Sequence, residues 1–263
     1  MRAMVLDNPK PAEQAPLTLR ELPDPAPAAG QVRVRVRVCG LCHTDLHTVE
    51  GDLPLPKLPV VPGHQIVGIV DATGPQVRRL REGDRVGVPW LFSTDQACAY
   101  CRSGNENLCD HARFTGYHVD GGYADAVIVA EDYAYPIPSA FTDLNAAPLL
   151  CAGIIGYRSW RKSGVRRGDR LGLYGFGASA HIVIQLARHD GQEVSVFTRA
   201  PAHQHLASRL GAAWVGLAEE KPPSELDAAI IFAPAGALVP RALAAVRKAG
   251  RVVLAGITMS PIP

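Results

Sequence analysis

The sequence predicts a chain of two parts, an irregular antiparallel β-barrel over residues 1–150 followed by an α/β domain with a parallel sheet over residues 151–263. Three observations support this division. The first part consists of short strand-like segments interrupted by proline and glycine. The second part alternates strand-like with helix-like segments, and a glycine-rich turn joins its first strand to its first helix.

The clearest strand of the first part is residues 31–38, where valine and arginine alternate strictly. This alternation predicts one apolar and one solvated face. Further strands are predicted at 66–70, 85–88 and 126–130, each bounded by Gly, Pro, Asp or Glu. We expect few helices in this part.

The second part has the alternation typical of a Rossmann-type domain. Strands are predicted at 170–174, 193–198, 212–215, 228–232 and 251–255, and helices at 179–189, 202–210 and 238–248. These are five strands, whereas a complete doubly wound sheet of this type has six. The predicted Rossmann sheet is therefore incomplete.

The composition favours a small-molecule partner. Lys plus Arg (27) nearly balances Asp plus Glu (25), which argues against a surface for nucleic acid or an anionic membrane. The N-terminus has no apolar stretch typical of a signal peptide, and nowhere do 18 uncharged apolar residues follow one another, so we expect a cytoplasmic protein. The close spacing of the six cysteines then indicates metal or redox chemistry rather than disulfides.

One candidate metal site is a compact D-x2-C-x2-C-x7-C pattern formed by Asp95, Cys98, Cys101 and Cys109. Cys and Asp both bind zinc, and four ligands on one short loop would close the coordination shell, as in a structural site. The alternative is a set of buried or redox-active cysteines.

A second candidate group, Cys42, His64 and Cys151, is dispersed along the chain. A single Cys or His is more often part of a core than a ligand. Together, however, two thiolates and one imidazole would leave the fourth position of a zinc ion open, as in a catalytic site.

The third pattern, G-x-G-x-x-A, runs from Gly175 through Gly177 and Ala178 to Ala180 between a predicted strand and helix. Gly175 permits a tight turn, Gly177 allows the backbone to approach a pyrophosphate, and Ala180 allows close helix packing. This predicts a dinucleotide site; the alternative is an ordinary strand-to-helix turn.

The end of the second Rossmann strand bears on the choice of cofactor. An acidic residue there would bind the ribose 2′-hydroxyl of NAD, but the sequence has Thr198 and Arg199. Because arginine pairs well with a 2′-phosphate, NADP is favoured over NAD. Arg199 could instead be a solvated loop residue.

In their shared order, the stretches CGLCHTDLH, VPGH, CAYCRSGNENLC, LLCAG and GFGASA make the chain similar to the zinc-dependent medium-chain alcohol dehydrogenases over its whole length. The resemblance implies a GroES-like catalytic domain with a structural-zinc lobe at 95–109, followed by a Rossmann domain. It also implies that Cys42, His64 and Cys151 are the ligands of the catalytic zinc.

The resemblance implies roles for four further residues. Asp45 would orient the ligand His64, since a metal-binding histidine needs a partner on its other ring nitrogen. Thr44 and His47 would relay the alcohol proton to solvent. Trp90 would narrow the pocket for small primary alcohols, although a buried structural tryptophan is an alternative.

The chain departs from the family pattern at four points. Asp95 stands in place of the first cysteine of the lobe, and Gln65 in place of the acidic residue after the ligand histidine, which removes a charge near the metal. Thr198 is the departure that concerns the cofactor. The sequence ends at Pro263, before the sixth strand that forms the dimer contact in the family, so we expect a C-terminally truncated chain without that contact.

The leading functional prediction is a zinc-dependent oxidoreductase that interconverts a primary alcohol and its aldehyde by hydride transfer to or from NAD(P). A second hypothesis is an inactive, truncated remnant that binds zinc and a dinucleotide. A third is a thiol redox sensor built on Cys39 with Cys42 and Cys98 with Cys101.

Overall fold

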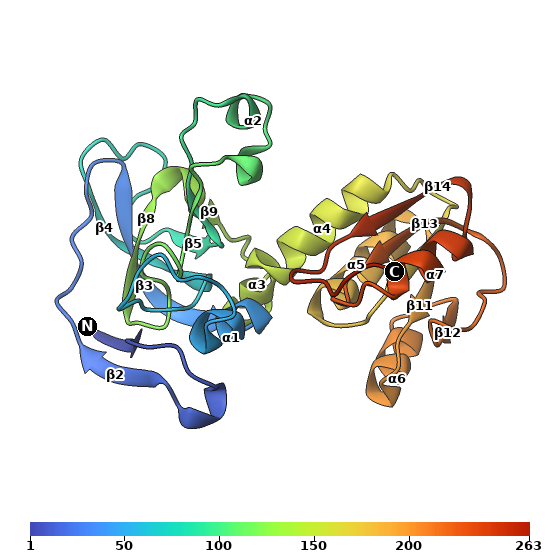
Figure 1. Ribbon diagram of the computed structural model, residues 1–263. Helices are drawn as coiled ribbons and strands as arrows, with labels where there is room; N and C mark the ends of the chain where they lie inside the picture. The colour runs from blue at the N-terminus through green and yellow to red at the C-terminus, as the bar shows by residue number, and fades with distance from the viewer. The chain divides into compact units, whose positions relative to one another are not determined.

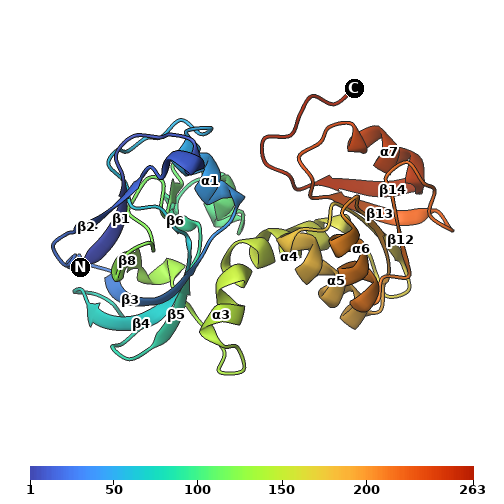
Figure 2. The ribbon, with the colours of Figure 1, turned by 90° about the horizontal axis from the view of Figure 1, so that it is seen from below.

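The computed structural model describes all residues, 1–263, and divides into two compact units, Met1–Cys151 and Ala152–Pro263. Figures 1 and 2 show the elements of both units from two directions. None of the helices is long and apolar enough to span a membrane.

The first unit is built on a five-stranded antiparallel sheet in the order β8-β3-β4-β5-β9. Its strands are β3 (Gln31–Gly40), β4 (Gln65–Thr73), β5 (Arg85–Val88), β8 (Ala126–Ala130) and β9 (Tyr135–Pro136). The four strands predicted from the sequence are confirmed. This unit contains the antiparallel, GroES-like part of the predicted fold.

The alternation of β3 has the predicted physical consequence. Val32 and Val34 are fully buried in the core, whereas the arginines between and after them point to the solvated face. There Arg33 and Arg35 both pair with Asp71 on β4. The sheet therefore has one face fixed by apolar burial and one fixed by ion pairs.

Smaller elements surround this sheet. They are the hairpin of β1 (Arg2–Leu6) and β2 (Leu17–Glu21), the pair β6 (Leu91–Ser93) and β7 (Arg113–Phe114), and the short helices α1 (His43–Glu50), α2 (Ala99–Arg102) and α3 (Asp143–Ala146). Short 3-10 turns occur at Ala12–Gln14, Glu106–Leu108, Glu131–Tyr133 and Ala147–Leu150. Of these elements, the start of α1, the loop around α2 and the end of the turn Ala147–Leu150 carry candidate metal ligands.

The second unit is a five-stranded parallel sheet in the order β12-β11-β10-β13-β14. The strands are β10 (Arg170–Tyr174), β11 (Glu193–Phe197), β12 (Trp214–Gly216), β13 (Leu226–Ile231) and β14 (Val246–Leu254). The helices α4 (Ala152–Ser163), α5 (Ala178–Asp190) and α6 (Pro201–Arg209) cover one face, and α7 (Leu238–Ala245) covers the other (Figure 2). This is the predicted partial Rossmann fold.

Two elements of this unit differ from the prediction. The helix predicted at 238–248 ends at Ala245, because Val246 is extended and opens β14. The helix α4 was not predicted, since Gly153 and Gly156 lower its helix propensity. A Cβ on Gly156 would lie 2.9 Å from Val183 Cγ2, so the glycine allows α4 to pack closely on α5.

Candidate metal and cofactor sites

The structure brings Cys42, His64 and Cys151 together within the first unit. Cys42 is the N-cap of α1, His64 directly precedes β4, and Cys151 follows the turn Ala147–Leu150. Cys42 Sγ lies 3.4 Å from His64 Nε2 and 3.9 Å from Cys151 Sγ. All three potential ligand atoms lie within 4.8 Å of one another.

These distances between ligand atoms are close to those found around a tetrahedrally coordinated zinc ion. Two sulfur atoms bound at about 2.3 Å to such an ion lie about 3.8 Å apart. The hydrogen bond between the two thiols lowers the pKa of Cys42 and raises that of Cys151. A divalent cation would bind both sulfurs as thiolates with release of their protons, because thiolates are the zinc-binding form.

Asp45 fixes the imidazole of His64 from behind. One carboxylate oxygen, Oδ1, lies 3.0 Å from His64 Nδ1, and the other accepts the backbone N–H of Cys42 at 2.8 Å. Both side chains are buried. Although burial opposes it, the contacts with Asp45 and Cys42 raise the pKa of His64 to about 9. Nε2 is thus directed at the two sulfurs.

Gln65 is the first residue of β4 and lies opposite Gly40 on β3. Its side chain is buried, and a Cβ on Gly40 would lie 2.7 Å from Gln65 Oε1. The register of the two strands therefore buries a neutral amide directly after the candidate ligand His64, where the resemblance implies a carboxylate.

Thr44 and His47 follow Cys42 on α1 without joining the metal cluster. His47 Nδ1 lies 2.8 Å from Oδ2 of Asp52, which comes directly after the helix-ending Gly51. Asp52 was not predicted from the sequence. Its only signal was a carboxylate just beyond the end of a short helix, a position where acidic residues are common without any function.

Trp90 lies beside the ligand histidine, as part of a cluster of aromatic rings. Its ring meets that of His64 edge-on at 4.9 Å and stacks on Phe114 at 5.1 Å between centroids. Tyr117 also contacts Trp90, and its hydroxyl donates to the carbonyl oxygen of Pro54 at 2.6 Å. Trp90 therefore forms a wall next to the candidate metal site.

The second cluster is formed by Asp95, Cys98, Cys101 and Cys109, whose ligand atoms also lie within 4.8 Å of one another. Cys98 Sγ lies 3.5 Å from Cys101 Sγ. Asp95 Oδ1 accepts the backbone N–H groups of Cys98 and Ala97, each at 2.9 Å, and these bonds lower the pKa of the carboxyl. The carboxylate is therefore in the charged form that binds a cation.

The glycine turn has the shape of a phosphate cradle. Gly175 has φ +86°, and a Cβ there would lie 3.0 Å from the backbone N of Ala233. Gly177 caps α5 without a side-chain hydrogen bond, and a Cβ on it would meet no atom within 4 Å. Ala180 is fully buried against the sheet. The first turn of α5 thus has backbone N–H groups available to bind an anion.

Thr198 and Arg199 follow the carboxyl end of β11. Thr198 is buried, its N–H donates to Gly216 O at 3.0 Å, and its carbonyl accepts from Gln204 Nε2 at 2.9 Å. Arg199 is exposed. No carboxylate follows β11 at this point, so a positive charge occupies the position of the predicted ribose ligand.

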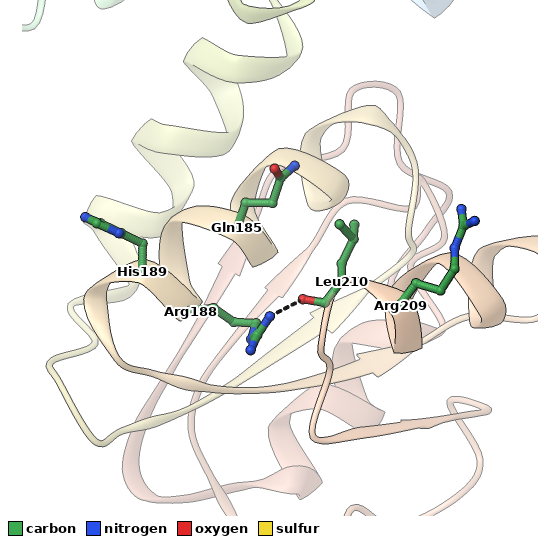
Figure 3. Close-up of a pocket in the computed structure, with 5 residues that line it drawn as sticks. All are labelled: Gln185, Arg188, His189, Arg209 and Leu210. Carbon is green, nitrogen blue, oxygen red and sulfur yellow. Dashed lines mark hydrogen bonds between the residues drawn. The ribbon is translucent and has the colours of Figure 1, made fainter.

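A hollow of about 430 Å³ lies at the other end of α5, lined by Gln185, Arg188, His189, Arg209 and Leu210 (Figure 3). Arg188 donates to the carbonyl oxygen of Leu210 at 2.7 Å. Since dinucleotides bind at the carboxyl ends of the strands, near the start of α5, this basic hollow is distinct from the cofactor cradle.

The chain is similar to known proteins along its whole length. Residues 28–139 match the alcohol dehydrogenase GroES-like domain. A probable alcohol dehydrogenase AdhA from Mycobacterium tuberculosis is 46% identical, with 100% of this chain and 78% of the relative covered. An alcohol dehydrogenase from Geobacillus stearothermophilus is 37% identical, with 100% of this chain and 80% of the relative covered.

Solved structures of alcohol dehydrogenases also have the same fold as this chain. A cinnamyl alcohol dehydrogenase from Sorghum bicolor superposes with a TM-score of 0.89 at 27% identity, covering 100% of this chain and 78% of that one. The fold, the two clusters of potential metal ligands and these relatives together show that the chain belongs to the zinc-dependent medium-chain alcohol dehydrogenase family.

Proposed function

We propose that this chain is an oxidoreductase that interconverts a primary alcohol and its aldehyde by hydride transfer to or from NAD(P). The observation that carries the proposal is the convergence of two thiols and one buried imidazole, Cys42, His64 and Cys151, with Asp45 bonded to the far side of the imidazole. A redox-sensor function is less well supported, because it gives no role to His64.

In the proposed site, the three side chains would bind the catalytic zinc and leave one coordination position for substrate. Zinc, when bound, supplies the Lewis acidity that lowers the pKa of an alcohol hydroxyl or polarises an aldehyde. The nicotinamide, when bound, accepts or donates the hydride. Asp45 keeps the histidine oriented, and Gln65 leaves the site less negative than a carboxylate would.

The proton is handled by residues of α1. The Thr44 hydroxyl would accept the alcohol proton while it donates its own proton onward, and His47 would release a proton to solvent through Nε2. Asp52 supports this role, because its contact with Nδ1 orients the ring and leaves Nε2 as the nitrogen that exchanges a proton with solvent. In aldehyde reduction the same groups supply the proton.

We further propose that Gly175, Gly177, Ala178 and Ala180 bind the cofactor pyrophosphate, and that Thr198 and Arg199 favour NADP over NAD. The absence of a carboxylate after β11 supports this preference. Structural relatives include a protein from Helicobacter pylori complexed with NADP(H) and one from Escherichia coli complexed with NADH, so both cofactors occur among similar folds.

Trp90 is proposed to line the alcohol pocket, because its ring contacts the ligand His64 directly. Asp95, Cys98, Cys101 and Cys109 are proposed to bind a second, structural zinc, since four donors close the shell of the ion.

The deciding experiment measures zinc per chain on purified protein together with reduction of a panel of aldehydes by NADPH and, in parallel, by NADH. We expect two zinc ions per chain and turnover that is faster with NADPH. Zinc binding without turnover would overturn the proposed activity and favour a protein that only binds zinc and a dinucleotide. A chain free of zinc would overturn both metal assignments.

A further inference from the structure

The two oxygens of the Asp95 carboxylate have different partners. Oδ1 accepts two backbone N–H groups, those of Ala97 and Cys98, at 2.9 Å each. Oδ2 lies 3.2 Å from Nδ1 of His111, two residues beyond Cys109. Since a carboxylate oxygen has two lone pairs, both pairs of Oδ1 are used, whereas Oδ2 keeps one.

This count identifies the oxygen that is available to a cation. Once both N–H groups and the imidazole are bonded, Oδ2 keeps one lone pair, and the carboxyl also has a side-chain contact with the thiol of Cys101, one of the three cysteines of the cluster. The carboxylate belongs to the cluster with Cys98, Cys101 and Cys109, whose ligand atoms lie within 4.8 Å of one another. Oδ2 is therefore the expected metal-binding atom of Asp95.

We propose that His111 is a positioning residue for this ligand: its Nδ1–H donates to Oδ2 of Asp95 and fixes the plane of the carboxylate toward the three sulfurs. The inference rests on the proposed zinc in the lobe but not on catalysis.

A carboxylate needs such support more than a thiolate does. A cysteine presents its charge on one atom, whereas Asp95 shares its charge between two oxygens and has one more rotatable bond. The two backbone bonds fix Oδ1, and the imidazole fixes the rotation that presents Oδ2. Replacement of a cysteine by aspartate thus creates a need for a donor, and His111 lies in the position to supply it.

The expected effect is moderate. Hydrogen-bond partners of metal ligands contribute roughly 10- to 100-fold to metal affinity. The side chain of His111 is 79% exposed and that of Asp95 is 24% exposed, so water competes for the bond. We therefore expect an effect near the lower limit, about tenfold.

The test follows zinc release from the full-length protein to a chromophoric chelator. The release phase that belongs to the lobe is the one that Cys109→Ser abolishes. We expect His111→Ala to speed this phase about tenfold and His111→Asn, whose amide can still donate to Oδ2, to stay close to the native rate. Asp110→Asn, which removes a neighbouring exposed carboxylate, is the control and should leave the phase unchanged.

Asp95→Cys supplies the decisive comparison, because a thiolate in this position needs no such donor. His111→Ala should then have no effect when combined with Asp95→Cys. If His111→Ala speeds zinc release equally in the native protein and in Asp95→Cys, His111 only stabilises the loop. If His111→Ala leaves the release rate of the native protein unchanged, His111 does not position the ligand. Either result overturns the inference. Absence of a lobe phase in the native protein would instead refute the structural zinc itself.

Discussion

Thr44 lies on the first turn of α1, where its backbone N–H hydrogen-bonds the Cys42 thiol, but it adds no ligand to the candidate zinc site. In the proposed reaction its hydroxyl accepts the alcohol proton, so Thr44→Val removes proton transfer while Cys42, His64 and Cys151 remain. We expect turnover to fall roughly 10²- to 10⁴-fold, with zinc content unchanged. Steady-state kinetics and metal analysis on the same preparation test this. A parallel loss of zinc would mean that Thr44 maintains the metal site instead.

A second residue-scale prediction concerns Thr115, which is fully buried and whose Oγ1 has no hydrogen-bond partner. Since an unpaired buried polar group is costly, Thr115→Val should raise the free energy of unfolding by about 1 kcal/mol. Thr48→Val is the matched control, because the Thr48 hydroxyl is equally buried but donates to Thr44 O at 2.9 Å. Urea unfolding should show stabilisation in the first variant and destabilisation in the second. Equal effects would refute the distinction.

At the scale of elements, variants of the glycine turn Gly175–Ala180 should distinguish its contribution to stability from its proposed contribution to cofactor binding. Gly177→Ala adds a Cβ that meets no protein atom within 4 Å, so we expect stability to change by less than about 1 kcal/mol. The same Cβ would stand where a pyrophosphate approaches the backbone, so dinucleotide affinity should fall at least about tenfold.

Gly175→Ala is the complementary variant. Its φ of +86° and the nearby Ala233 backbone strain any side chain, so this variant should lose stability even without cofactor. Thermal unfolding and nucleotide titration of both variants test the pair. Unchanged nucleotide affinity in Gly177→Ala would place the cofactor elsewhere.

Asp227 joins three strands of the parallel sheet. Asp227 lies at the start of β13. Its carboxylate accepts a hydrogen bond from Arg247 Nε on β14 at 2.6 Å and another from the backbone N–H of Arg170 on β10 at 2.8 Å. The Arg247 hydrogen bond is the main cause that lowers the pKa of Asp227. A carboxyl with a lowered pKa stabilises the fold above its unfolded-state pKa of about 3.9 and loses that contribution as the pH falls.

Asp227→Asn should therefore destabilise the protein at pH 7, and the difference from the native chain should shrink as the pH falls below about 4. Urea unfolding at several pH values measures this. A difference that stays constant with pH would show that packing, not ionisation, makes the contribution.

Elements with a strong local signal could be predicted from the sequence, and those that depend on distant contacts could not. The alternation in β3 and the glycine turn before α5 each determine their structure locally. The helix α4 contains two glycines and forms because it packs on α5, which no local pattern reveals. Likewise, the ligand pattern in the lobe was visible in the spacing of its cysteines, whereas His111 is defined only by its contact with Asp95.

For the whole molecule, metal and nucleotide should act on different units. Both ligand clusters lie within Met1–Cys151, and the glycine turn lies within Ala152–Pro263. Hydrogen exchange followed by mass spectrometry should show faster exchange at 39–48 and 95–111 after chelation, and slower exchange at 174–182 after addition of NADP. The hairpin β1–β2 serves as an internal reference. Changes spread evenly over both units would contradict this assignment.

The two clusters of candidate metal ligands also differ in how much of the chain must be synthesised before all their ligands are present. All four donors of the lobe lie between residues 95 and 109, whereas Cys42 and Cys151 are 109 residues apart. A ribosome adding about 5–20 residues per second completes the lobe roughly 2 to 8 seconds before it reaches Cys151. The lobe proposed to bind structural zinc can therefore be loaded on the nascent chain, ahead of the cluster proposed for catalysis.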